Sequence, residues 1–63
     1  MQGQTTWDAT TIRALRDRLG ISQEAMAHLL GVSFCTVNRW EGGRPPSPLS
    51  RRALTLLAEA NGA

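Results

Sequence analysis

Glycines divide this chain into segments that are too short to be stable on their own. Gly20, Gly31 and the pair Gly42 and Gly43 separate stretches whose apolar residues recur with helical rather than alternating spacing. Isolated helices of this length are marginal in water, because nucleation is costly and few hydrogen bonds follow it. The segments must therefore pack on one another, and we expect short helices around one shared core.

The first three helical segments begin with the same local pattern. An N-cap residue stands directly after an apolar residue, and a second apolar residue follows in the first turns of the helix. Such an arrangement satisfies free backbone N–H groups and forms a hydrophobic staple. The caps are Asp8, Ser22 and Ser33, and the staple pairs are Trp7 with Ile12, Ile21 with Met26, and Val32 with Val37. The pattern predicts helices that end at Gly20, Gly31 and Gly42.

A proline-rich stretch predicts a loop followed by one more helix. Pro45 and Pro46 cannot lie inside a helix, because proline lacks an N–H group and restricts the residue before it to extended geometry. Ser47 and Pro48 have the residue types of an N-cap and a first helical position. The buried side of this helix is expected to carry Leu49, Ala53, Leu54, Leu56 and Leu57. The sequence thus predicts an all-α bundle of four short helices, a fifth remaining an alternative, in one domain over 1–63 with its core at about 8–60.

Size and composition favour binding over catalysis. A chain of 63 residues leaves little room for a substrate pocket of roughly 300–1,000 Å³. The single cysteine, Cys35, has no disulfide partner, and no Cys/His cluster has metal-ligand spacing. We therefore expect no enzyme, cofactor, metal or small-molecule ligand.

The same features bear on location. One unpaired cysteine fits a reducing, cytoplasmic setting. No apolar run approaches the roughly 20 residues of a membrane span. Residues 1–7 have neither the basic start nor the apolar stretch of a signal peptide. We expect a cytoplasmic protein with no membrane partner.

The basic residues are all arginine, and their excess lies in the second half of the chain. Seven arginines against five acidic residues give a net charge of +2. Residues 1–31 carry three of each sign, whereas residues 32–63 carry four arginines and two acidic residues. Arginine favours planar, two-point contacts with phosphates and base edges. This balance is compatible with a polyanionic partner without being specific for one.

The stretch 23–41 has the spacing of two helices joined by a tight turn. Ala27 is small where two helices must cross closely, and Gly31 supplies the left-handed turn position. Three apolar residues fix the second helix of the pair at a steep angle on the first: Val32, Val37 and Trp40. This is helix-turn-helix spacing.

At this point the sequence resembles the bacterial and phage repressor-like helix-turn-helix domains, often called the xenobiotic-response-element type. The resemblance runs from about residue 12 to residue 57 and is carried by the stretches Ile12–Arg16, Leu19–Gln23, Leu30–Ser33 and Val37–Arg44, followed by Pro-Ser-Pro. It implies a lambda-repressor-like fold with the helix-turn-helix at the second and third helices. It also implies a sequence-specific regulator of transcription that binds double-stranded DNA and acts as a repressor.

The resemblance assigns base reading to the helix over residues 34–41, which would enter the major groove. Positions that match the family's base readers are Phe34, Cys35, Asn38 and Arg39. Arg39 can bond guanine O6 and N7, Asn38 can pair with adenine, and Phe34 can contact a thymine methyl.

Phosphate contacts are implied at the starts of the second and third helices. Gln23 matches a glutamine that in the family braces a phosphate and supports the recognition helix. Free N–H groups at these helix starts suit phosphate oxygens, with Ser22, Ser33 and Thr36 beside them. Arg44 lies on the loop that relatives press against the DNA backbone.

Arg16 and Glu41 match a pair that in relatives forms an internal salt bridge between the first helix and the end of the third. The residues themselves support this, because a carboxylate beside Trp40 needs a partner.

Three questions stay open at the level of sequence. The chain could act as a monomer or as a homodimer formed through the last helix and Trp7. An exposed aromatic at Phe34 also leaves an alternative function, a protein-interaction or antitoxin-like adaptor module on the same fold. Cys35 at a helix start leaves a redox role open.

Overall fold

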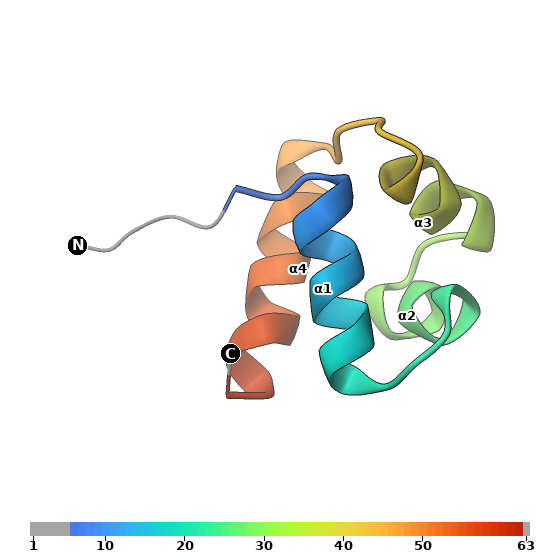
Figure 1. Ribbon diagram of the computed structural model, residues 1–63. Coiled ribbons are helices and arrows are strands. Elements are labelled where there is room, and N and C mark those ends of the chain that lie inside the picture. The colour runs from blue at the N-terminus through green and yellow to red at the C-terminus, as the bar shows by residue number, and fades with distance from the viewer. Residues whose placement is uncertain (1–5, 63) are drawn as a thin grey trace.

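The computed structural model describes residues 6–62 as four α-helices joined by short connections (Figure 1). The helices are α1 (Ala9–Leu19), α2 (Gln23–Leu30), α3 (Phe34–Glu41) and α4 (Pro48–Ala60). Neither a strand nor a fifth helix occurs in this part of the chain. The predicted all-α bundle of four helices is confirmed, with α2 and α3 forming the predicted helical pair. Within the same residues, no helix has the length and apolar character needed to cross a membrane.

The predicted caps set the helix boundaries. In each helix, the side chain of the N-cap accepts a hydrogen bond from the backbone N–H three residues on, the caps being Asp8, Ser22, Ser33 and Ser47. The connection between α2 and α3 turns at Gly31, whose φ of 73° lies in the left-handed region that a side chain would strain. The sequence therefore fixes both where α2 ends and how closely α3 follows it.

One side chain from each helix is completely buried: Ile12, Met26, Val37 and Leu54. Trp7, Leu15, Ala27 and Trp40 complete the core. Trp7 lies before α1 and reaches α4, where its Nε1 donates a hydrogen bond of 2.9 Å to the Thr55 hydroxyl. The core thus joins both ends of the described chain to the α2 and α3 pair.

The prediction for the buried side of α4 was wrong for two leucines. Leu54 is fully buried and Leu57 packs beside it, but Leu49 is 78% exposed and Leu56 is 57% exposed. Burial of Leu54 turns Leu57 and Ala58, three and four positions on, toward the core. Leu49 and Leu56 are seven positions apart, so they share a different face, which is turned to solvent.

The packing leaves the outer side of α3 uncovered. α3 packs against α1 and α2, and α4 packs against α2. In Figure 1, α1 lies between α4 and α3, so that α3 forms one flank of the molecule.

Candidate nucleic-acid interface

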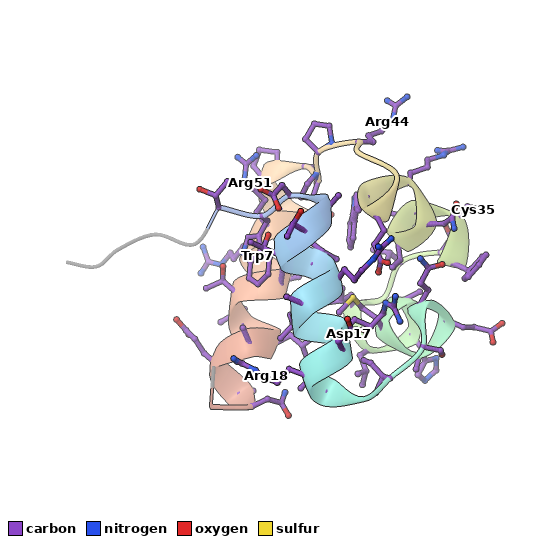
Figure 2. All side chains as sticks on the ribbon, viewed as in Figure 1. Trp7, Asp17, Arg18, Cys35, Arg44 and Arg51 are labelled. Carbon is purple, nitrogen blue, oxygen red and sulfur yellow. The ribbon has the colours of Figure 1, made fainter. Side chains whose placement is uncertain are left out.

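The four predicted base-contacting residues lie together on the exposed side of α3, here called the α3 outer face. Phe34, Cys35, Asn38 and Arg39 are all exposed, and Phe34 retains 48% of its accessible surface. They follow one another at helical spacing, so a partner approaching α3 meets all four. Figure 2 shows Cys35 pointing away from the rest of the protein.

The opposite side of α3 is held rigidly in the protein. Val37 is completely buried, Trp40 is 4% exposed and Glu41 is 9% exposed. Two apolar side chains and one charged one therefore fix the rotation of α3 about its axis. A helix fixed in this way can present side chains to an external surface in one orientation.

Glu41 is the charged anchor of α3, and its partner is α1. Its carboxylate accepts hydrogen bonds from Arg16 Nε at 2.7 Å and from Arg16 Nη2 at 3.0 Å. Arg16 also donates to the backbone carbonyl of Ile21 at 3.1 Å. The two residues that sequence reasoning paired are thus in two-point contact, which is the strongest geometry for arginine and carboxylate.

This environment keeps Glu41 ionised although its side chain is only 2% exposed. The hydrogen bonds from Arg16 come first, and those from Gln23 and Arg13 add to them, so the pKa of Glu41 falls from an ordinary 4.5 to about 2 despite burial. The same contact raises the pKa of Arg16. The pair is therefore charged at every pH at which the protein is expected to work.

Sequence reasoning missed one member of this cluster. Arg13 Nε lies 3.4 Å from Glu41 Oε1, and the Arg13 side chain is 60% exposed. Arg13 lies three residues before Arg16 and therefore on the same face of α1, so this spacing could have predicted that both arginines contact Glu41.

Gln23 connects the anchor to the α3 outer face. Its Nε2 donates to Glu41 Oε1 at 3.1 Å, and its Oε1 accepts from Asn38 Nδ2 at 3.2 Å. The amide of Asn38 is therefore held in one orientation. Its carbonyl oxygen and its second N–H remain to meet a base edge, since a side-chain amide carries two donor hydrogens.

The predicted phosphate-contacting residues lie at the starts of α2 and α3 and on the following loop. Ser22 and Ser33 accept from the N–H groups of Ala25 and Thr36. These caps leave the remaining first-turn N–H groups of each helix free for an anion. Figure 2 shows Arg44 directed outward from the loop after α3.

The charge at this surface is positive once the internal pair is set aside. Glu41 is neutralised within the protein, and the α3 outer face carries Arg39 and no carboxylate. Arg44 adds a second exposed cation on the adjoining loop. Within residues 6–62 no cluster of three or more His, Cys, Asp or Glu side chains could hold a metal ion.

α2 and α3 are two short helices joined by a tight turn, and the outer side of α3 is free. This arrangement defines a helix-turn-helix domain. The comparison with family models agrees: the family described as "Helix-turn-helix domain" matches residues 9–63. The chain therefore belongs to this helix-turn-helix family, and the resemblance drawn from the sequence is confirmed. Searches of curated proteins and of solved structures gave no match. Family membership indicates a DNA-binding regulator.

Proposed function

We propose that this protein is a transcriptional repressor that binds double-stranded DNA sequence-specifically and reads the major groove with α3. The observation that carries the proposal is the two-sided character of α3. Its inner side is fixed by buried Val37, Trp40 and Glu41, while its outer face is exposed and free of carboxylates. A rigid, exposed helix of this kind fits the width of the major groove.

Each residue of the α3 outer face has a distinct part in the proposed readout. Arg39 bonds guanine O6 and N7 through its planar guanidinium, and Asn38 pairs with adenine. The hydrogen bond from Asn38 to Gln23 supports this, because it holds the amide in place before DNA arrives. Phe34 contacts a thymine methyl, and Cys35 makes a short side-chain contact with a base.

The proposed phosphate contacts frame α3 on both sides. Ser22 and Gln23 lie at the start of α2, Ser33 and Thr36 at the start of α3, and Arg44 on the loop that follows. Free N–H groups and hydroxyls at helix starts position a protein on the DNA backbone without reading sequence.

We further propose that residues 1–63 form a single helix-turn-helix DNA-binding domain, with its core at about 8–60, and that the protein acts in the cytoplasm without catalytic activity. Two copies on a roughly palindromic operator would place their α3 helices about one helical turn, roughly 34 Å, apart.

The decisive experiment is selection of preferred sites from a random duplex library, followed by titration of the selected duplex and a scrambled one of equal length. The proposal expects one enriched motif and an affinity that falls steeply between roughly 50 and 200 mM salt. Equal affinity for both duplexes at all salt concentrations would refute sequence-specific recognition.

A second candidate function is a protein-interaction or antitoxin-like adaptor module. It is favoured by the exposure of Phe34 at 48% and of Leu29 at 58%, since exposed apolar side chains can anchor a protein partner. Such a complex would keep its affinity as salt rises, whereas a phosphate-dominated complex would not. The duplex titration therefore separates the two functions, because an adaptor that binds only protein would show no salt-sensitive affinity for either duplex.

A further inference from the structure

The exposed side of α4 carries an apolar stripe that the core does not use. Four residues, here called the α4 seam, make up this stripe: Leu49, Ala53, Leu56 and Ala60. Leu49 is 78% and Leu56 57% exposed, Ala60 is exposed and Ala53 is half-buried. Their spacings of four, three and four residues are those of a helix that packs along a second helix.

Two exposed charges run along one edge of this seam. Arg52 and Glu59 are both exposed and lie seven positions apart, so they share the same edge of α4. Seven residues span about 10 Å of helix, which is too far for the two side chains to pair with each other. Neither forms a salt bridge within residues 6–62.

A second copy of α4, running antiparallel, complements the seam in size. In one register, Leu49 lies opposite Ala60 of the second copy and Ala53 lies opposite Leu56 of the second copy. Two-fold symmetry repeats both contacts, so every leucine of the seam meets an alanine. Large residues facing small ones allow two helices to approach closely without voids.

The same register complements the charges. In an antiparallel pair of helices, residues on one edge of the seam meet the equivalent edge of the partner helix. Arg52 then lies beside Glu59 of the second copy, and symmetry forms this ion pair twice. A parallel pair would instead bring unlike edges together and would lose this match. Size and charge thus select one arrangement independently.

We propose that the protein forms a two-fold homodimer through antiparallel packing of the α4 seam, with Arg52 and Glu59 forming reciprocal ion pairs across the interface. A two-fold axis near the middle of α4 also relates the two α3 helices, as a palindromic operator requires. The dimer deepens the proposed function by naming its partner, but the pairing itself does not depend on DNA. Because α4 is only about 20 Å long, the interface is small, and association in the micromolar range or weaker is expected.

The test is sedimentation equilibrium of the full chain without DNA, from micromolar to millimolar concentration. The wild type is expected to approach twice the monomer mass, and Leu56→Glu to remain monomeric with its helical circular dichroism intact. Arg52→Glu and Glu59→Arg each replace two ion pairs by like-charge contacts and should weaken self-association by about tenfold.

The most discriminating measurement is the association of the two charge variants with each other after mixing. Arg52→Glu has only acidic residues at positions 52 and 59, and Glu59→Arg has only basic ones. Each should pair poorly with itself but well with the other, and the double variant should recover wild-type association. Arg51→Glu, the same charge change on the neighbouring residue, is the matched control and should leave the dimer unaffected, because Arg51 lies off the seam and donates to the carbonyl of Pro46.

A wild type that stays monomeric throughout would overturn the inference. Equal weakening by Arg51→Glu and Arg52→Glu, or no recovery on mixing, would do the same. Binding of a single half-site duplex is measured separately. A monomer that binds this duplex refutes the dimer alone, whereas a dimer that binds no DNA refutes the proposed function alone.

Discussion

The guanidinium of Arg16 on α1 holds the carboxylate of Glu41 at the end of α3 through two hydrogen bonds of 2.7 and 3.0 Å. This contact joins two helices that are distant in sequence, and it lies directly beneath the α3 outer face. The orientation of the proposed reading residues therefore depends on an ion pair on the inner side of α3, which makes none of the proposed DNA contacts.

Arg16→Met should loosen α3 without removing any proposed DNA contact. It leaves a nearly buried carboxylate with only Arg13 and Gln23 as partners, so we expect a loss of about 2–4 kcal/mol in the free energy of unfolding. Urea denaturation measures this loss. Arg18→Met, at an exposed arginine of the same helix, is the control and should change stability by less than about 0.5 kcal/mol. An Arg16→Met protein with wild-type stability and wild-type DNA affinity would contradict the assigned role.

The low pKa of Glu41 predicts a loss of stability in acid. A carboxyl group with a pKa of about 2 in the folded protein and 4.5 when unfolded binds protons more tightly in the unfolded chain. Its stabilisation is therefore complete above about pH 5.5 and disappears as the pH falls through 2. Integrated over this pKa shift, the contribution of Glu41 to the free energy of unfolding is about 3 kcal/mol.

Urea titrations between pH 7 and pH 2 test this dependence. Glu41→Gln removes the titrating group, so its free energy of unfolding should vary less with pH than that of the wild type. A shallow slope should remain, because hydrogen bonds from Thr11 lower the pKa of Asp8 in the same direction. Equal slopes in both proteins would show that Glu41 is not the responsible group.

Arg39 and Arg44 should differ in what their loss does to DNA binding. Arg39→Ala should cost about 1–3 kcal/mol on the preferred duplex and relax the preference at one base pair, because its proposed contact is to a guanine edge. Arg44→Ala should weaken binding to preferred and scrambled duplexes alike, since a phosphate contact carries no sequence information. Fluorescence anisotropy with both duplexes measures the two effects. If both variants lost affinity equally on both duplexes, the assignment of Arg39 as a reading residue would be wrong.

Local residue patterns were enough to predict where each helix begins and where the first three helices end. The caps at Asp8, Ser22, Ser33 and Ser47 act within one turn of their own helix, so no tertiary information is needed to find them. The exposed side of α3 could also be predicted, because Val37 and Trp40 mark its inner side.

The rotation of α4 could not be predicted in this way. Its leucines and alanines form one broad arc that covers more than half of the helix circumference, so periodicity alone does not decide whether Leu49 and Leu56 or Leu54 and Leu57 face the core. Which face of α4 is buried depends on the surfaces of α1 and α2 against which it packs, and these surfaces form only in the tertiary structure. The individual hydrogen bonds of Gln23 to Glu41 and Asn38 also depend on tertiary packing. Only the family resemblance, and no local residue pattern, indicated that Gln23 supports the recognition helix.

The hydrogen bond between Trp7 and Thr55 should fasten the start of the domain to α4. Trp7 is 8% exposed, so removal of its acceptor leaves an indole N–H largely shielded from water. Thr55→Val preserves shape and should cost about 1 kcal/mol in the free energy of unfolding. Phenylalanine has no indole N–H that could lose its acceptor. In a Trp7→Phe background, Thr55→Val should therefore leave the free energy of unfolding unchanged. A double-mutant cycle by thermal denaturation measures this coupling, and additive effects of the two substitutions would mean that the hydrogen bond contributes nothing.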